Sequence, residues 1–482
     1  MDFLLANIES KTYALSVPDE SFSYVNIRHV NFYANADAAC SFMPSDKLEA
    51  AFYKTLAQFP LLVGDLTQRS DGHLEIVVNK DDLNMPGYRE SQSEVDFRDI
   101  KSAQYNQKTW PSDLETVGKV PCPDANSARI KLADIHIVRM KNNTGLIIST
   151  AFVHATTDGY GCFEFLNRWA EETRALITGE PARHQVFCFD RSAIRSYLPA
   201  ERAPISDMTR NTYTDKSWFA DFLTWLSPIS RGKLMSYLAG MAPVEGCLFR
   251  VNYDRFEELR YHLLEHVPYG TRISDNDLLS AVLYKVTTQA NIRSSGEEPG
   301  WLARTISRAM GIRNEHCLGI PCDIRHRLDM TDISYIGNPM YHVYFSKPMD
   351  YAGTPTTPTS LGDIAAMVRK IVSEATPPRI GTLYDVLETE DISLGNFSAN
   401  LMSFKMVTGI SNQIRFRFYE ADFGNGVQSF ATVMPDFGEG TVIFLPSPPP
   451  SRDILVNLTV SPQVKECILK DRFWMQLAEF VY

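Results

Sequence analysis

The residues best suited to chemistry are His154 and Asp158, which stand four positions apart in the stretch HATTDG at residues 154–159. An imidazole can take up a proton near neutral pH, because its unperturbed pKa is about 6.5. On a continuous helix this spacing would place both side chains on one face, where the carboxylate could orient the imidazole. The small residues between them and Gly159 favour a turn instead, in which Asp158 would brace the loop through an arginine or backbone amides. Spacing alone therefore leaves open whether His154 is a base or a buried structural residue.

Hydrophobic periodicity indicates which elements hold His154. Residues 146–153 are apolar and rich in β-branched side chains, which predicts a buried strand that ends at the histidine. Apolar residues then recur at helical spacing until Gly179 and Pro181, so we expect a helix after a short turn. His154 would lie at a strand-to-helix junction, which can hold a side chain rigidly and still open it to a ligand.

The rest of the chain alternates predicted strands and helices, which is typical of α/β layers. We expect strands at residues 22–33, 74–78, 130–138, 247–253, 341–345, 413–419 and 441–445. We expect helices to begin at four serines: Ser45, Ser274, Ser360 and Ser461. Two of these starts read as capping boxes: Ser274 with Asp277, and Ser360 with Asp363. Residues 79–128 show no sustained period and predict an irregular connection, and the pattern weakens again over residues 178–246, apart from a short helix predicted at 218–226.

Length, charge and cysteine usage narrow the class of protein. A chain of 482 residues exceeds one ordinary hydrophobic core, so two domains are expected. A net charge of -11 argues against a nucleic-acid partner, because binding a polyanion needs a basic face. We find neither a targeting segment nor an apolar run of membrane-spanning length, and we expect a cytoplasmic protein without a membrane partner. The eight cysteines are dispersed without ligand-type spacing, which predicts reduced thiols and no metal site.

A set of further motifs adds to the evidence from His154. Residues 154–159 match the H-x-x-x-D-G signature of the BAHD-type coenzyme A-dependent acyltransferases, and DFGNG at residues 422–426 resembles the D-F-G-W-G motif of that family. Four more segments resemble family motifs in the family's order: FPLLVGDL at 59–66, SDNDLLSAVL at 274–283, DIRHR at 323–327 and GN at 337–338. Each motif is short, but together they span most of the chain. The sequence thus resembles this family, and in particular its fungal, trichothecene 3-O-acetyltransferase-like branch.

The resemblance implies an α/β fold of two chloramphenicol-acetyltransferase-like domains with a channel between them. We expect an N-terminal domain at residues 1–200 that carries HATTDG and a C-terminal domain at residues 246–482 that carries DFGNG. Residues 201–245 would be the crossover linker, and we expect the protein to act as a monomer.

The resemblance also implies roles for individual residues. His154 would be the general base that takes a proton from an acceptor hydroxyl or amine as this group attacks the thioester of an acyl-CoA. Acyl-CoA would be a co-substrate, and no cofactor would be bound tightly. Asp158 becomes a brace rather than a relay, because the family keeps this loop in shape with an Asp-Arg pair. Asp422 would be a structural residue tied to an arginine, with Arg325 as the first candidate partner and Arg327 as the second.

The sequence departs from the family pattern near the expected cofactor contacts. Asn425 stands where the family usually has tryptophan, and Ser411-Asn412-Gln413 replaces the usual Ser-Trp pair. Relatives bind the pantetheine arm of coenzyme A in this region, so Ser411, Asn412 and Asn425 are the candidate cofactor-binding residues. Their polar groups could hydrogen-bond the pantetheine amides or a substrate carbonyl, or could only fill space beside the loop.

Three functions are compatible with these residues. The leading hypothesis is transfer of a small acyl group from acyl-CoA to a hydroxyl or amine of a specialised metabolite. The first alternative keeps the fold and uses His154 for an intramolecular condensation or cyclisation without coenzyme A. The second alternative is a non-catalytic binding protein, although a scaffold has no evident use for an intact H-x-x-x-D-G.

Overall fold

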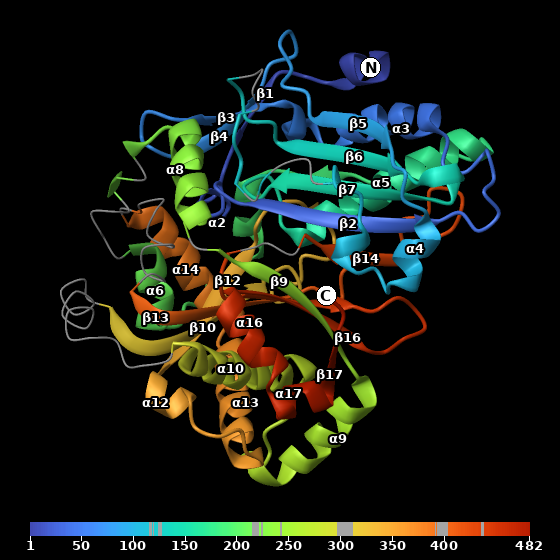
Figure 1. Cartoon of the computed structure of the whole chain (residues 1–482). Helices are drawn as coiled ribbons and strands as arrows, with labels where there is room; N and C mark the ends of the chain where they lie inside the picture. Colours follow the sequence, from blue (N-terminus) through green and yellow to red (C-terminus); the bar gives the residue numbers. More distant parts are fainter. Residues whose placement is uncertain are drawn as a thin grey trace.

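The chain folds into two large sheets, drawn one above the other in Figure 1, with helices packed against them. The computed structural model describes residues 1–114, 118, 120–123, 128–214, 221–222, 225–241, 243–295, 312–390, 392, 403–434 and 438–482. This architecture confirms the predicted α/β class. The predicted domain limits at residues 200 and 246 stay a prediction.

The first sheet has five strands in the order β14-β2-β7-β6-β5. Their bounds are β2 (Asn26–Ala34), β5 (Gly87–Gln92), β6 (Ala133–Arg139), β7 (Gly145–Val153) and β14 (Phe430–Val433). The central strand β7 is buried at every position, which explains its continuous apolar sequence. β14 comes from the C-terminal half of the chain and pairs antiparallel with β2, so the C-terminal half completes the edge of the N-terminal sheet.

The second sheet has seven strands in the order β12-β10-β13-β15-β16-β9-β17. Their bounds are β9 (Glu245–Val251), β10 (Arg313–Asp323), β12 (Met340–Pro348), β13 (Phe404–Asn412), β15 (Thr441–Pro446), β16 (Ile454–Val460) and β17 (Ala478–Phe480). Two smaller sheets join β1 (Lys11–Ala14), β4 (Leu74–Val78) and β3 (Asp65–Gln68), and β8 (Phe187–Cys188) with β11 (Ser334–Tyr335). The β8–β11 pair joins the segment after the His154 helix to the segment after the DIRHR motif.

Helices cover both sheets. The N-terminal half contains α1 (Asp2–Asn7), α2 (Val17–Glu20), α3 (Ser45–Gln58), α4 (Phe97–Ser102), α5 (Gly159–Thr178), α6 (Asp207–Thr214) and α8 (Pro228–Met241). The C-terminal half contains α9 (Tyr253–Leu263), α10 (Asp275–Ser294), α12 (Met349–Ala352), α13 (Pro358–Ser373), α14 (Pro377–Thr389), α16 (Pro462–Leu469) and α17 (Arg472–Leu477). Short 3-10 helices lie at Pro60–Val63 (η1), Gln107–Thr109 (η2), Lys141–Asn143 (η3), Arg191–Tyr197 (η4) and Leu264–His266 (η5).

Two hydrophobic cores lie on the two faces of the second sheet. Leu248 of β9 and Leu455 of β16 join the core of the N-terminal half. Their neighbours Phe249 and Val456 point to the opposite face of the sheet, into the second core, which also contains residues of α10 and α13. Alternate residues of these strands thus serve both cores, because successive side chains of a strand point to opposite faces. The sheet is therefore buried on both sides, and the two halves share an extensive apolar contact.

Most predicted elements are confirmed with small shifts of their ends, including the strands at residues 22–33, 74–78, 130–138, 247–253, 341–345 and 441–445. The helix that begins after Ser461 and the capping box of Ser274 with Asp277 are also confirmed. The helix predicted at residues 218–226 lies largely outside the described residues.

Four local predictions are wrong. Pro44, not Ser45, precedes the first turn of α3, and the Ser45 hydroxyl donates to Glu90 instead (2.8 Å). The second capping box is formed by Thr357 with Ser360, since Pro358 already sets the helical φ of the first turn of α13.

The other two wrong predictions concern a strand and a loop. Residues 413–419 do not form a strand, because the Asn412 side chain accepts a hydrogen bond from Ile414 N (3.1 Å) and turns the chain where β13 ends. The irregular region 79–128 contains β5 and α4. β5 is a short edge strand whose side chains are polar and partly exposed, so its sequence lacks the usual apolar alternation.

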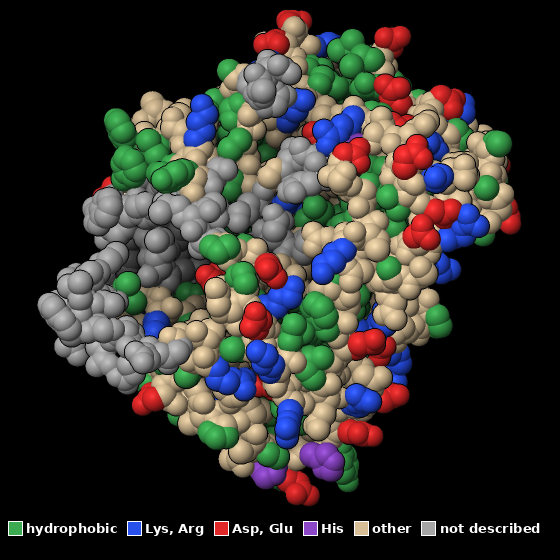
Figure 2. All heavy atoms as spheres, in the orientation of Figure 1, with side chains coloured by type: hydrophobic (Ala, Val, Ile, Leu, Met, Phe, Trp, Pro, Cys, Tyr) green, Lys and Arg blue, Asp and Glu red, His purple; other side chains and the backbone are tan. Residues whose placement is uncertain are grey.

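Charged side chains of both signs are interspersed over the face shown in Figure 2, with hydrophobic side chains in small groups between them. The electrostatic field over this face is therefore mixed in sign. Among the helices in the described ranges, none is both long and apolar enough to span a bilayer.

Candidate active site

His154 directly follows β7 and opens a tight turn that leads into α5. Its backbone N–H donates to Val25 O (2.8 Å), which continues the pairing of β7 with the chain before β2. Thr156 then folds back, and both its N–H (2.8 Å) and its hydroxyl (2.7 Å) donate to Val153 O. Asp158 caps α5 by accepting a hydrogen bond from Gly161 N (3.0 Å). The predicted strand, turn and helix are confirmed, and the continuous helix that would have stacked His154 and Asp158 does not form.

The Asp158 carboxylate points to Arg325 and forms a bidentate pair with it. The two distances are 2.7 Å from Nη1 to Oδ2 and 3.2 Å from Nη2 to Oδ1. Arg325 also donates to Tyr335 O (3.1 Å), and its guanidinium lies 4.5 Å from the centre of the Tyr160 ring. The neighbouring carboxylates of Asp158 and Asp323 raise the pKa of Arg325 against the effect of burial. The pair thus ties the turn after His154 to the DIRHR segment of the C-terminal half.

The His154 ring is largely enclosed. It stacks on Phe22 at 4.6 Å between ring centres with 22° between the planes, and Asn338 Nδ2 donates to His154 O (2.8 Å). Burial lowers the pKa of the imidazole, and the carbonyl of His154 itself, Asp158, Asn338 and Asp19 act against this effect. The net direction is downward, so the imidazole is neutral at neutral pH and can accept a proton.

The predicted partners of Asp422 are wrong. Arg325 pairs with Asp158, and Arg327 donates to Ala375 O (2.8 Å). The cation beside Asp422 is Arg174 of α5, which lies 3.8 Å from the carboxylate and donates to Asp422 O (3.1 Å). Asp422 itself accepts hydrogen bonds from the backbone of its own loop. It is a structural residue as expected, but its arginine comes from the helix that follows His154.

Comparisons with known proteins indicate the class to which the chain belongs. A model of the transferase family matches residues 6–220, which include His154 and its turn. An eremophilane O-acetyltransferase of Penicillium rubens is 23% identical over 356 residues, which cover 69% of this chain and 70% of that protein. The chain is an acyltransferase whose residues 6–220 match the transferase family.

Solved structures confirm the predicted fold of two chloramphenicol-acetyltransferase-like domains. TRI101 of F. sporotrichioides, complexed with coenzyme A and T-2, matches the acyltransferase with a TM-score of 0.70 at 14% identity, over 98% of this chain and 100% of that chain. Vinorine synthase matches with a TM-score of 0.61 at 15% identity, over 97% of this chain and 94% of that chain.

The structure separates the three candidate cofactor-binding residues of the acyltransferase. Ser411 and Asn412 end β13, and Asn412 Nδ2 donates to Asn276 Oδ1 at the start of α10 (3.0 Å). Asn425 is exposed and accepts a hydrogen bond from Met43 N (2.9 Å), which links the DFGNG loop to the N-terminal half. Within the described part of the chain, no contact joins Asn425 to Ser411 or Asn412. Their roles toward coenzyme A stay a prediction.

Gln413, which the sequence analysis named together with Ser411 and Asn412, is buried beside the start of α5, and a Cβ added to Gly159 would lie 3.6 Å from its amide nitrogen. Sequence reasoning missed two polar residues near His154, Asp19 and Arg191. Asp19 and Arg191 form a buried ion pair at 2.8 Å that borders the turn after His154. The Ser16-x-x-Asp19 pattern is a capping box in the structure, so a search for such patterns could have found α2. No local pattern could have shown that Arg191, 172 positions away, would meet it.

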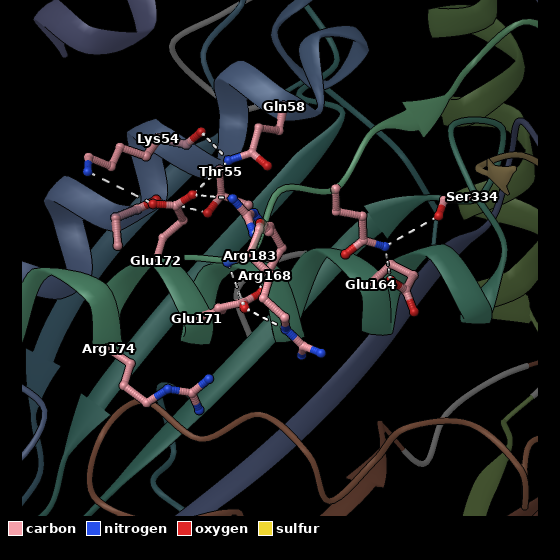
Figure 3. A network of polar contacts seen from close by, with 12 residues as sticks. Lys54, Thr55, Gln58, Glu164, Arg168, Glu171, Glu172, Arg174, Arg183 and Ser334 are labelled. Atoms are coloured by element: carbon pink, nitrogen blue, oxygen red, sulfur yellow. Dashed lines mark hydrogen bonds and ion pairs between the residues drawn. The ribbon is translucent and has the colours of Figure 1, made fainter. Parts of the chain in front are cut away.

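A network of charged side chains fixes the polar face of α5 (Figure 3). Arg168 is buried and donates to Glu172 (2.5 Å), which also accepts a hydrogen bond from Gln58 of α3 (2.9 Å). Nearer the start of α5, Arg417 donates to Glu164 (3.1 Å) and holds the segment after β13. The helix that starts at Asp158 is thus attached to α3 on one side and to the C-terminal half on the other.

We expect Gly161→Ala to destabilise the acyltransferase. A Cβ at Gly161 would lie 1.9 Å from Thr157 Oγ1 and 3.2 Å from Ile336 Cγ2, so the turn would have to move. Overpacking of this kind lowers the free energy of unfolding by about 1–3 kcal/mol. Urea unfolding measures the change. Gly409→Ala is the control, because its Cβ would meet nothing within 4 Å, and equal losses in both variants would contradict the assignment.

Proposed function

We propose that this acyltransferase moves an acetyl or similarly small acyl group from acyl-CoA to a hydroxyl or amine of a specialised metabolite, with His154 as the general base. The observation that carries the proposal is the neutral, enclosed imidazole at the end of β7, beside a turn in which the Asp158 carboxylate is already paired with Arg325. A neutral imidazole can take a proton, and the paired Asp158 keeps the turn in shape.

The reaction needs one proton acceptor and no enzyme nucleophile. His154 takes the proton of the acceptor hydroxyl or amine while the acceptor atom bonds to the thioester carbonyl carbon. The tetrahedral intermediate then collapses, its carbon–sulfur bond breaks, and the leaving thiolate takes the proton from the imidazolium. The lowered pKa leaves the ring neutral, so one ring nitrogen carries a proton and the other offers a lone pair to the proton of the acceptor.

The named relatives support the choice of substrates. One is an eremophilane O-acetyltransferase, and TRI101 was crystallised with coenzyme A and T-2. We propose that Ser411 and Asn412 at the end of β13 contact the pantetheine arm, and that Asn425 contributes on the side of Met43. The proposal includes a cytoplasmic monomer with two small-molecule partners and neither nucleic acid nor a membrane.

Release of free thiol from acetyl-CoA tests this proposal. We expect the recombinant protein to release coenzyme A from acetyl-CoA when a hydroxylated terpenoid or another accepted metabolite is present, and mass spectrometry should show the acceptor gaining one acetyl group. A product that forms equally well without acyl-CoA would support the condensation alternative instead. The absence of turnover across a broad acceptor panel, together with absent coenzyme A binding, would support a binding protein.

A further inference from the structure

Asp19 is a buried carboxylate that accepts hydrogen bonds from both halves of the protein. It lies in α2, is fully buried, and completes the capping box with Ser16 N (2.9 Å) and Ser16 Oγ (2.6 Å). Arg191 Nε donates to the same oxygen (2.8 Å). The other oxygen accepts from Asn338 N (3.0 Å) and Asn338 Nδ2 (2.8 Å). One carboxylate therefore fixes both the backbone and the side chain of Asn338.

Asn338 connects Asp19 to His154. One hydrogen of its Nδ2 goes to Asp19 and the other to His154 O, both at 2.8 Å. The amide is thereby held in a single orientation, because both of its donors are used. Its Oδ1 is then left as an acceptor without a donor among the described residues.

Two buried atoms at this place have no hydrogen-bond partner among the described residues. Within the described ranges, neither Asn338 Oδ1 nor His154 Nδ1 has a partner that meets hydrogen-bond geometry. Buried polar atoms normally have a hydrogen-bond partner. The unpaired Asn338 Oδ1 is an acceptor and the unpaired His154 Nδ1 can carry a proton, so the two atoms are complementary. The Asn338 side chain raises the pKa of His154, as an acceptor facing an N–H does.

Arg191 keeps this arrangement neutral and attached to the catalytic turn. Its side chain is 7% exposed and pairs with Asp19, so the buried carboxylate has a compensating charge. It also donates to Thr156 O (3.0 Å), to Phe189 O (3.1 Å) and to Ile336 O. The turn after His154 and the segment before Asn338 are thus held by the same guanidinium.

We propose that Asp19 and Asn338 are positioning residues for the general base: Asp19 fixes Asn338, and Asn338 Oδ1 accepts the Nδ1 proton of His154, so that Nε2 faces the acceptor. The inference rests on the proposed function. An asparagine carbonyl in this role would do what the third member of a catalytic triad does. Asp158 cannot do it while it is paired with Arg325.

Several charged and titratable groups act on His154 and contribute to its pKa. Asp158 and Asp19 raise its pKa, and burial together with the charge of His154 lowers the pKa of His342 to about 3. His342 is therefore neutral in the working range. A shift in the acidic limb of the pH–activity profile can then be attributed to His154 and to the groups that face it.

The pH profile of kcat tests the proposal with Asn338→Ala and the nearly isosteric Asp19→Asn. Both remove groups that raise the pKa of His154. The base works in its neutral form, so activity is lost as pH falls through its pKa, and we expect the acidic limb to move to lower pH. Misplacement of the ring should lower kcat by about 10- to 100-fold. The KM for acetyl-CoA should change by less than about twofold, because ground-state binding is not involved.

Asp277→Asn is a matched control that separates an effect on the position of the His154 ring from an effect on the stability of the fold. Asp277 is also fully buried, caps a helix through Ser274 (2.8 Å from Ser274 N to Asp277 Oδ2) and pairs with Arg369, but none of its bonds leads to His154. Asp277→Asn should cost stability and leave the acidic limb where it is. The proposal would be overturned if the acidic limb of the pH profile did not move in Asn338→Ala. It would also be overturned if Asn338→Ala and Asp19→Asn lowered kcat no more than Asp277→Asn does.

A measurement on the unmodified protein covers the case in which a variant does not fold. Nitrogen-15 spectra of histidine-labelled protein, assigned by comparison with His154→Gln, should show Nδ1 protonated and Nε2 unprotonated. The opposite tautomer would contradict the inference. If His154→Ala keeps full activity, the proposed function itself fails. If that variant is inactive while the limb stays unmoved in Asn338→Ala, only the present inference fails.

Discussion

His154→Ala lowers kcat for acyl transfer by about 10²- to 10⁴-fold, the range expected for the loss of a general base. The ring contributes its proton-accepting nitrogen, while the backbone of residue 154 supplies the contacts to Val25 and Asn338 that shape the turn. The side chain can therefore be removed without breaking these bonds. Thiol release from acetyl-CoA with a saturating acceptor measures the effect.

The pH profile and a control variant make this result specific. In the unmodified protein burial lowers the pKa of His154, so activity should persist below pH 6.5 and fall only as the pH approaches that lowered pKa. This limb should disappear in His154→Ala. His262→Ala, an exposed histidine of α9, should match the unmodified protein. Full activity of a folded His154→Ala would remove the assignment.

Arg325→Ala lowers the free energy of unfolding by about 3–5 kcal/mol, because it leaves the Asp158 carboxylate buried without its partner. The carbonyl of Tyr335 loses a donor as well. Asp158→Asn keeps the shape of the side chain and removes its charge, and we expect it to destabilise the protein too. Urea unfolding of the two single variants and of the double variant measures the coupling between them.

The double variant decides whether Asp158 and Arg325 act as a unit. Its cost should be clearly smaller than the sum of the two single costs, since removing the second charge relieves the first. Arg327→Ala is the matched control from the same DIRHR segment. It removes a hydrogen bond to Ala375 O, and the loss should be about 0.5–1.5 kcal/mol. Additive costs for Asp158 and Arg325 would contradict a structural pair.

Local patterns predicted the elements that hold His154 well. The apolar run of β7, the turn of small residues and the left-handed Gly179 after α5 (φ 80°) are all properties of neighbouring residues, and all three were foreseen. The end of β13 was misjudged because one side-chain hydrogen bond, from Ile414 N to Asn412, turns an otherwise strand-like sequence.

Long-range pairings were harder to predict. The resemblance implied that Asp158 and Asp422 each pair with an arginine, but it did not show which acid meets which arginine. Arg325 and Asp158 are 167 positions apart, and Arg174, which meets Asp422, lies in no motif that we had singled out. The same holds for Asp19 and Asn338, 319 positions apart, whose contact exists only once the two halves pack together.

Calorimetric titration of the folded protein with coenzyme A tests the central claim most directly, because it needs no knowledge of the acceptor. We expect saturable binding of one coenzyme A per chain, and weaker binding when Ser411 or Asn412 is replaced. No heat of binding at millimolar coenzyme A, with the protein folded by circular dichroism, would contradict acyl transfer from acyl-CoA and favour chemistry at His154 without a coenzyme.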